Sequence, residues 1–285
     1  MNNAYLNGKF LPLENATVSV LDRGFLFGDG VYELIPVYSR KPFRLEQHLS
    51  RLQASMDGIG LVNPHTQADW ARIIACMIEQ VDYADQSLYL QVTRGADSKR
   101  SHAFPAVVRP TIFMMSEALS TPDALQREQG VAAITAADIR WLRCDLKTTA
   151  LLANCLLRQA AINAACVETV LLRDGFLTEG SASNIFVVSH DVLLAPIKNH
   201  FMLPGVTYDV VLELAAQNGL RSEVRDITED EVRNADELWL TSSAKEVLPI
   251  VRLDGKPIGN GAPGPVFTQM HGWYQEFKAT VMRAA

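Results

Sequence analysis

The stretch DIRWLRCDLK, residues 138–147, lies near the middle of the chain and ends in Lys147. The residues that follow, 148–164, have a helical pattern, so a helix is predicted to begin directly after the lysine. A lysine there is unusual, because cations are disfavoured near helix N-termini. A lysine desolvated by apolar, Trp-containing sequence can serve in Schiff-base chemistry. An exposed lysine at a helix edge is the ordinary alternative, so the interpretation depends on the rest of the chain.

Two later segments carry residues that could serve a cofactor. In the first, TEGSASN (residues 178–184), Glu179 stands beside small hydroxyl residues and could face a cationic ring nitrogen. A solvated turn is the usual structure of such a Glu-Gly-Ser stretch. In the second, LPGVT (residues 203–207), Gly205 exposes backbone N–H groups at a helix start and Thr207 adds a hydroxyl. Such a helix start can bind phosphate, although Pro-Gly before a helix is more often only a cap.

Motifs and composition exclude several other classes of protein. The stretch FGDGV (residues 27–31) lacks the further glycine of a GxGxxG dinucleotide motif, because Glu33 stands there, and no GxxxxGK[ST] loop is present. The histidines form no HExxH motif and the cysteines no CxxC pair, so no metal site is predicted. The net charge of −6 argues against a broad nucleic-acid or anionic-membrane surface. With no signal-peptide pattern and no run of about 18 apolar residues, a cytoplasmic protein is expected.

A length of 285 residues suggests about two domains, since a domain holds roughly 100–200 residues. Residues rich in β-branched and aromatic side chains predict strands at 31–38, 88–93, 111–116, 131–136, 168–172, 185–188 and 238–241. Helical spacing predicts helices at 49–59, 68–81, 148–164, 206–217 and 266–282. The polar stretch 120–129 is interpreted as a linker between an N-terminal domain, 1–119, and a C-terminal domain, 130–285. Both domains are predicted to be α+β.

Taken together, these segments resemble the fold-type IV pyridoxal-phosphate (PLP) enzymes, and in particular the D-amino-acid (D-alanine) transaminases. The resemblance covers nearly the whole chain and rests on motifs in sequential order: Asp22-Arg23-Gly24, then residues 27–33, 48–52, 91–95, 100–102, 138–147, 179–184 and 240–243. The lysine segment and the Glu179 turn are specific to this fold type in combination. The resemblance implies a two-domain α+β fold of type IV and PLP as the cofactor.

The resemblance also implies roles for individual residues. Lys147 would hold PLP as a Schiff base and move the proton between Cα and C4′, which makes it the expected catalytic residue. Glu179 would bond the pyridine nitrogen and keep it protonated. Arg51 would grip the phosphate, although an exposed arginine on a helix is the alternative that the sequence alone favours. The remaining cofactor-binding residues would be Leu203 near the ring, with Val206, Thr207 and Thr241 near the phosphate.

The loop around residues 99–102 bears on the substrate. In the D-amino-acid transaminases an Arg-x-His pair on this loop comes from the neighbouring subunit and forms a carboxylate trap with a tyrosine. The resemblance assigns these roles to Arg100, His102 and Tyr32, and it implies a homodimer. Two cationic or donor side chains that converge on a carboxylate make physical sense. A solvated basic loop is the alternative interpretation of the same residues.

The reaction that the resemblance implies is a ping-pong transamination. A D-amino acid, with D-alanine expected, would give its amino group to a 2-oxo acid such as 2-oxoglutarate or pyruvate. Two relatives of the same fold stay open as alternatives, a branched-chain L-amino-acid transaminase and an aminodeoxychorismate-type PLP lyase.

Overall fold

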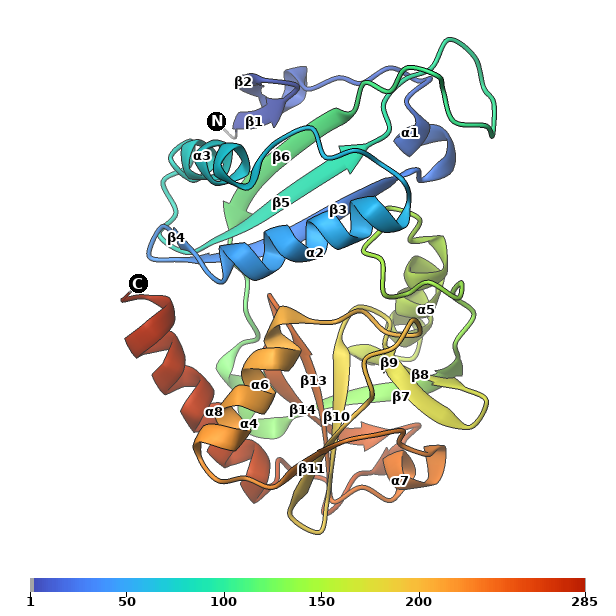
Figure 1. Cartoon of the computed structure of the whole chain (residues 1–285). Coiled ribbons are helices and arrows are strands. Elements are labelled where there is room, and N and C mark those ends of the chain that lie inside the picture. Colours follow the sequence, from blue (N-terminus) through green and yellow to red (C-terminus); the bar gives the residue numbers. More distant parts are fainter. Residues whose placement is uncertain (1–2, 285) are drawn as a thin grey trace. The chain divides into compact units, whose positions relative to one another are not determined.

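Strand β3 (Gly30–Tyr38) organises the first sheet, and its β-branched and aromatic residues favour extended backbone. Figure 1 shows a computed structural model of the chain, in which residues 3–284 are described. Strand β3 pairs antiparallel with β5 (Gln86–Thr93), which in turn pairs antiparallel with β6 (Thr111–Ala118). The predicted strands of this part of the chain are confirmed. The sheet order is β2-β1-β6-β5-β3-β4, with the outer strands β1 Asn3–Leu6, β2 Lys9–Pro12 and β4 Lys41–Pro42.

Helices α2 (Leu45–Gly58) and α3 (Gln67–Ile78) cover one face of this sheet (Figure 1). Side chains alternate between the two faces of a strand, so Val31 and Ile35 of β3 point to the same face. Both are fully buried in a core with apolar residues of the two helices. The covered face is therefore the core of this unit. The remaining helical elements here are η1 Leu13–Asn15 and α1 Arg23–Phe27.

The described chain divides into two compact units, one of residues 3–119 and Leu146–Leu151, the other of Ser120–Asp145 and Leu152–Ala284. The segment with the lysine thus groups with the first unit, and not with the C-terminal domain as predicted. The reason is backbone pairing with β3, since Val31 and Thr148 form an antiparallel bridge.

This pairing also corrects the predicted helix at 148–164. Thr149 N donates to the Gly30 carbonyl oxygen at 2.9 Å, and Thr148 forms an isolated β-bridge with Val31 where a helix was expected. Helix α5 therefore spans only Leu152–Asn163. Lys147 lies five residues before this helix and not at its start.

The stretch predicted as a linker, residues 120–129, contains a helix. Helix α4 (Ala124–Gln129) begins with a capping box in which Asp123 accepts from the amide of Gln126 and the Gln126 side chain returns to the N-cap backbone. Reciprocal caps of this kind stabilise even a short helix, and this stretch groups with the second unit.

The second unit is built on a mixed sheet in the order β12-β11-β10-β13-β14-β7-β8-β9, with β15 paired to β14. The strands predicted from sequence at 131–136, 168–172, 185–188 and 238–241 are confirmed as β7, β8, β10 and β13. The bounds are β7 Val131–Ala137, β8 Glu168–Arg173, β9 Phe176–Gly180, β10 Asn184–Ser189, β11 Val192–Ala195, β12 Ser222–Val224, β13 Glu237–Ser242, β14 Glu246–Leu253 and β15 Lys256–Pro257.

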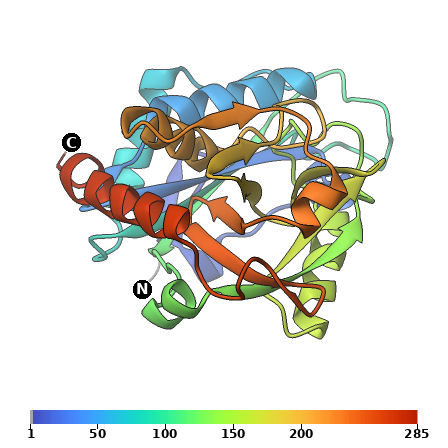
Figure 2. The same ribbon diagram turned by 90° about the horizontal axis from the view of Figure 1, so that it is seen from below.

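Helices α6 (Val206–Gln217) and α8 (Pro265–Phe277) pack against each other and against β13, as Figures 1 and 2 show. The predicted helix at 206–217 is confirmed. The last predicted helix is divided, because α8 continues as a π-helical turn, η2 (Lys278–Met282). Helix α7 (Glu229–Arg233) is a single capped turn. Within residues 3–284, no helix has the length and apolar character needed to cross a membrane.

Candidate active site

Lys147 lies at the edge of the first sheet, beside Tyr32. The Tyr32 amide donates to the Lys147 carbonyl oxygen at 2.9 Å, and the Lys147 amide donates to Ser55 Oγ of α2 at 3.0 Å. These two bonds fix the backbone of the lysine. Its Nζ lies 4.1 Å from the centroid of the Tyr32 ring, which is a cation–π distance. The structure thus brings together the expected catalytic lysine and the expected substrate-binding tyrosine.

Arg51 of α2 is paired with a buried carboxylate, Glu33 of β3. Its Nε donates to Glu33 Oε1 and its Nη2 to Oε2, both at 2.8 Å, while His48 Nδ1 lies 2.7 Å from Oε2. Burial raises the pKa of Glu33, but the charge and hydrogen bonds of Arg51, together with His48, bring it down to about 2. Burial lowers the pKa of His48, which favours its neutral form. The Glu33 carboxylate therefore orients the guanidinium that the family resemblance assigns to the phosphate.

Neither Glu33 nor His48 was among the predicted site residues. Strand alternation carries a signal for Glu33, because it shares the buried face of β3 with Val31 and Ile35. A buried carboxylate needs a charged or hydrogen-bonding partner. That partner could have been sought on the helix that follows.

Arg100 and His102, the predicted carboxylate trap, both lie against Phe27 of α1. The Arg100 guanidinium carbon is 5.1 Å from the Phe27 ring centroid, and the His102 ring centroid is 5.3 Å away. Their loop is held to α1 by Arg23, whose Nη1 donates to the Ser101 carbonyl oxygen at 2.5 Å. Arg100 and His102 therefore contact the same aromatic ring.

Glu179 lies at the centre of a buried cluster in the second unit. Its Oε1 is paired with Arg140, and its Oε2 accepts from Asn184 Nδ2 and from the Leu203 amide, each at 3.2 Å. Burial raises the pKa of Glu179 to about 7, against the lowering effect of the Arg140 charge and of these hydrogen bonds. The carboxyl can therefore hold or share a proton near neutral pH.

Arg140 is shared between Glu179 and a second buried carboxylate, Asp138. Arg140 Nε donates to Asp138 Oδ1 at 2.9 Å and Nη2 to Oδ2 at 2.8 Å. Asp138 also accepts from Thr178 Oγ1 at 3.0 Å and pairs with Arg173 at 3.2 Å. Although burial opposes it, the two carboxylates raise the pKa of Arg140, which stays charged. Both Asp138 and Arg140 belong to the motif that ends in Lys147, but no role was predicted for either.

The start of α6 and Thr241 form the other part of this cluster. Gly205 is the N-cap of α6 and has no side chain with which to cap the backbone N–H groups at Val206 and Thr207. Thr241 Oγ1 is buried and has no hydrogen-bond partner among the described residues. Thr241 is the register partner of Asn184 in the β10–β13 pair. A buried hydroxyl and uncapped amides suit an anion such as phosphate.

Gly205 brings these groups close to Glu179. A Cβ at this position would lie 2.0 Å from Asn184 Oδ1, so no larger residue fits while Asn184 keeps its place. Asn184 Nδ2 also donates to the Leu203 carbonyl oxygen at 2.9 Å. One asparagine thus connects Glu179 to the loop before α6.

The small hydroxyl residues after Glu179 do not serve that carboxyl. Ser181 and Ser183 both donate to a different buried carboxylate, Glu168, which also pairs with Lys245 at 3.1 Å. Although burial raises it, the Lys245 charge and the two hydroxyls hold the pKa of Glu168 below its ordinary value. The turn is therefore internally bonded, and the solvated turn that the sequence offered as an alternative is not formed.

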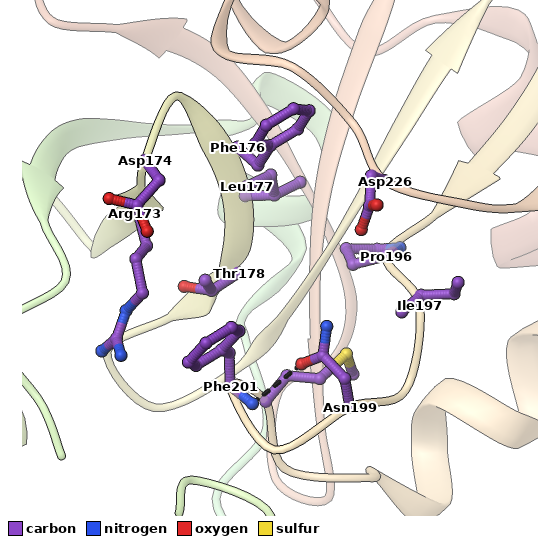
Figure 3. A pocket seen from close by; sticks show the side chains of 11 residues that line it. Arg173, Asp174, Phe176, Leu177, Thr178, Pro196, Ile197, Asn199, Phe201 and Asp226 are labelled. Atoms are coloured by element: carbon purple, nitrogen blue, oxygen red, sulfur yellow. Dashed lines mark hydrogen bonds between the residues drawn. The ribbon is translucent and has the colours of Figure 1, made fainter. Parts of the chain in front are cut away.

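A pocket of about 240 Å³ borders the Glu179 cluster on one side (Figure 3). Arg173 and Thr178, which both contact Asp138, form part of its wall, and Phe201 contributes its ring beneath the Arg173 guanidinium. The Phe201 carbonyl oxygen accepts from Arg140 Nη2 at 3.0 Å. The pocket wall therefore supports the residues that hold Arg140.

The match to a family model defines the class of protein. The chain matches the family model Amino-transferase class IV over residues 30–253. It belongs to this family, which uses PLP, and it has the fold of type IV.

The relatives found by sequence similarity indicate a narrower group than the family does. The D-alanine aminotransferase of Bacillus licheniformis is 39% identical over 260 residues, which cover 91% of this chain and 91% of that protein. The D-alanine aminotransferase of Listeria monocytogenes is 34% identical, with 95% of this chain and 94% of that protein covered. Among solved structures, a T.th. branched-chain amino acid aminotransferase with pyridoxamine 5'-phosphate superposes with a TM-score of 0.91. It is 26% identical, and the match covers 99% of this chain and 94% of that chain.

The residues of the second unit fit PLP. Glu179, with its raised pKa, can bond a ring nitrogen that carries a proton. Thr241 Oγ1, buried and unpartnered within residues 3–284, offers a donor to a phosphate oxygen. The start of α6 offers backbone N–H groups to the same dianion.

Proposed function

We propose that this aminotransferase transfers the amino group of a small D-amino acid, D-alanine above all, to a 2-oxo acid by a ping-pong mechanism. The observation that carries the proposal is the full-length similarity to D-alanine aminotransferases, at 39% identity for one of them. The branched-chain aminotransferase structure is 26% identical and supports the fold more than the substrate. The paired placement of Arg100 and His102 on Phe27 supports a carboxylate-bearing substrate.

We assign PLP binding to Arg51 and Lys147 of the first unit and, in the second unit, to Glu179, Leu203, Val206, Thr207 and Thr241. When bound, PLP supplies the electron sink that accepts the charge left at Cα after proton loss. Lys147 Nζ would take the proton from Cα and deliver it to C4′, and the fixed backbone of Lys147 limits where Nζ can reach. Glu179 would bond the pyridine nitrogen and keep it protonated, because a carboxylate accepts the hydrogen bond that the protonated nitrogen donates. Tyr32, Arg100 and His102 bind and orient the substrate carboxylate.

We further propose that the protein acts as a homodimer in the cytoplasm. One face of the first sheet supports a second copy, because Tyr32, Tyr89 and Phe113 form a row of half-buried aromatic rings there. Partly exposed aromatic side chains are enriched at protein interfaces. Sedimentation velocity would test the proposal, and a monomer at micromolar concentration would contradict it.

Half-reactions on purified holoenzyme test the substrate class. We expect D-alanine to convert the visible absorption of the bound cofactor much faster than L-leucine at equal concentration. A faster reaction with L-leucine would identify a branched-chain enzyme. Release of more than one equivalent of product per active site from an aminodeoxychorismate-type substrate, without any 2-oxo acid acceptor, would identify a lyase.

Two substitutions test the residue assignments. Lys147→Ala is expected to abolish steady-state transamination, by at least about 10³-fold, because the proton-transferring base is lost. Arg100→Ala is expected to lower kcat/KM for D-alanine by about 10²-fold, because a charged hydrogen-bonding partner of the carboxylate is removed. Unchanged kcat/KM in Arg100→Ala would contradict the carboxylate trap.

A further inference from the structure

Phe27 is the residue that both predicted carboxylate-binding side chains contact. It is the last residue of α1, and its ring is half-buried. The Arg100 guanidinium carbon lies 5.1 Å from the ring centroid. The His102 ring lies 5.3 Å away at an interplanar angle of 44°. Among the described residues, the Arg100 and His102 side chains form no hydrogen bond or ion pair. Both side chains are exposed, and the Phe27 ring is the aromatic ring that both contact within residues 3–284.

The backbone of this loop is held by a different residue. Arg23 donates from Nη1 to the carbonyl oxygens of Ser101 (2.5 Å) and Ala103 (3.2 Å), and from Nη2 to that of His102 (3.2 Å). Its own Nε is paired with Asp29 at 2.7 Å. Three consecutive carbonyl groups are thus fixed by one buried arginine. These hydrogen bonds hold the backbone of the loop and leave the orientation of the Arg100 and His102 side chains to other contacts.

The support that Phe27 offers is itself rigid. Helix α1 is capped by Asp22, whose Oδ1 accepts from the Gly24 amide and from Thr93 Oγ1, both at 2.8 Å. Asp22 Oδ2 accepts from Thr111 Oγ1 at 2.6 Å. Thr93 and Thr111 end β5 and begin β6. The helix that carries Phe27 is therefore anchored to the central strands.

We propose that Phe27 is a positioning residue for carboxylate recognition, which holds Arg100 and His102 as one preformed pair. This inference rests on the proposed role of the two residues in substrate binding. A flat aromatic face attracts the guanidinium through its quadrupole and limits the rotamers of both side chains. Ordering them in advance spares the substrate an entropic cost upon binding. The ring thus acts on the substrate's carboxylate through its neighbours and touches no reacting atom.

The test compares Phe27→Leu with a rescue variant and a matched control in the holoenzyme. Phe27→Leu keeps apolar bulk but removes the π face, whereas Phe27→Tyr keeps that face. Phe25→Leu is the control, because Phe25 lies on the same helix and is 70% exposed. The readouts are kcat and KM for D-alanine, and the Kd of propionate, a carboxylate without an amino group, by isothermal titration calorimetry.

We expect Phe27→Leu to raise the KM for D-alanine and the Kd of propionate by about tenfold, with kcat changed by less than about twofold. Phe27→Tyr and Phe25→Leu should keep values near those of the unsubstituted enzyme. Unchanged KM and propionate Kd in Phe27→Leu would overturn the inference. A parallel fall in kcat that Phe27→Tyr does not restore would also overturn it, since that pattern indicates a structural role only.

Arg100→Ala separates this inference from the proposed function. If Arg100→Ala leaves the propionate Kd unchanged, the carboxylate is bound elsewhere and the role of Phe27 is refuted. If propionate binding depends on Arg100 and Phe27 but the enzyme prefers L-leucine to D-alanine, the positioning role stands and the D-amino-acid function is refuted.

Discussion

Glu33 in the first unit and Glu179 in the second are both buried carboxyl groups that face an arginine, yet their pKa values move in opposite directions. The pKa of Glu33 falls from 4.5 to about 2, and that of Glu179 rises from 4.5 to about 7. In each case burial is the largest influence and raises the pKa. The difference must therefore come from what the neighbouring charges contribute.

The two arginines, Arg51 and Arg140, distribute their hydrogen bonds differently. Arg51 gives both of its paired hydrogen bonds to Glu33, and His48 adds a third contact. Arg140 gives two bonds to Asp138 and a single one to Glu179. Asp138 also raises the pKa of Glu179 through its own negative charge. The Arg51 guanidinium therefore brings the pKa of Glu33 below its usual range, whereas the guanidinium that Glu179 shares with Asp138 does not overcome the effect of burial.

This difference matches the tasks proposed for the two groups. A permanently charged Glu33 keeps the Arg51 guanidinium in one orientation, which suits a structural anchor. A carboxyl that titrates near neutral pH can exchange or share a proton with a ring nitrogen, which suits Glu179. Substituting the partners of Glu33 and Glu179 one at a time tests this comparison.

Arg51→Met is expected to have the largest effect. It leaves the Glu33 charge buried with His48 alone and should lower the free energy of unfolding by about 3–5 kcal/mol. Urea unfolding of the cofactor-free protein measures this. Arg72→Met is the control, because Arg72 is exposed on α3 and its pair with Asp69 lies at the surface. A loss below about 1 kcal/mol for Arg51→Met would show that Glu33 does not depend on the arginine.

The pH dependence of stability should have opposite signs for the two glutamates. Glu33, whose native pKa is lower than the unfolded value of 4.5, stabilises the fold above that pH, and this contribution is lost as pH falls toward 2. Glu179, whose native pKa is higher, stabilises the fold below pH 4.5, and this contribution is lost as pH rises toward 7. Each change is on the order of 3 kcal/mol.

The measurement is the unfolding free energy of the cofactor-free protein minus that of Glu33→Gln or Glu179→Gln, followed from pH 3 to 8. The Gln variants remove one titrating group each and keep the size of the side chain. Difference profiles with the same slope for the two positions would refute the comparison.

Asp138→Asn should lower the pKa of Glu179 and so make this carboxyl group more like Glu33. With the competing charge removed, Arg140 interacts mainly with Glu179, and the pKa of Glu179 should fall by about 1 or more below its value near 7. Carbon-13 NMR of labelled glutamate side chains measures that pKa directly. Asp145→Asn, at a partly exposed ion pair with Arg143, is the matched control. An unchanged pKa in Asp138→Asn would mean that burial alone sets it.

Thr178→Val is expected to have the smallest effect. It removes the hydroxyl that donates to Asp138 Oδ2 at 3.0 Å and should cost about 1 kcal/mol of unfolding free energy. The remaining partners of Asp138 are the two arginines, Arg140 and Arg173. A loss near that of Arg51→Met would show that the hydroxyl, and not the shared guanidinium, controls this cluster.

The sequence by itself determined the local features of this protein. A composition rich in β-branched and aromatic residues predicted β3, and helical spacing predicted α6, because both depend on residues a few positions apart. The order of motifs around Lys147 and Glu179 indicated the family, since chemistry requires those residue types. The carboxylate-binding role of Arg100 and His102 was implied by the family resemblance and not by their spacing.

The tertiary structure decided the features that join distant residues. Arg51 and Glu33 are 18 positions apart, and Arg140 and Glu179 are 39 apart, so no periodicity predicts either pair. Lys147 does not lie at a helix start, because its neighbours pair with Gly30 and Val31 across the chain. Ion pairing and sheet edges depend on which segments the fold brings together, and that information lies outside any local window of sequence.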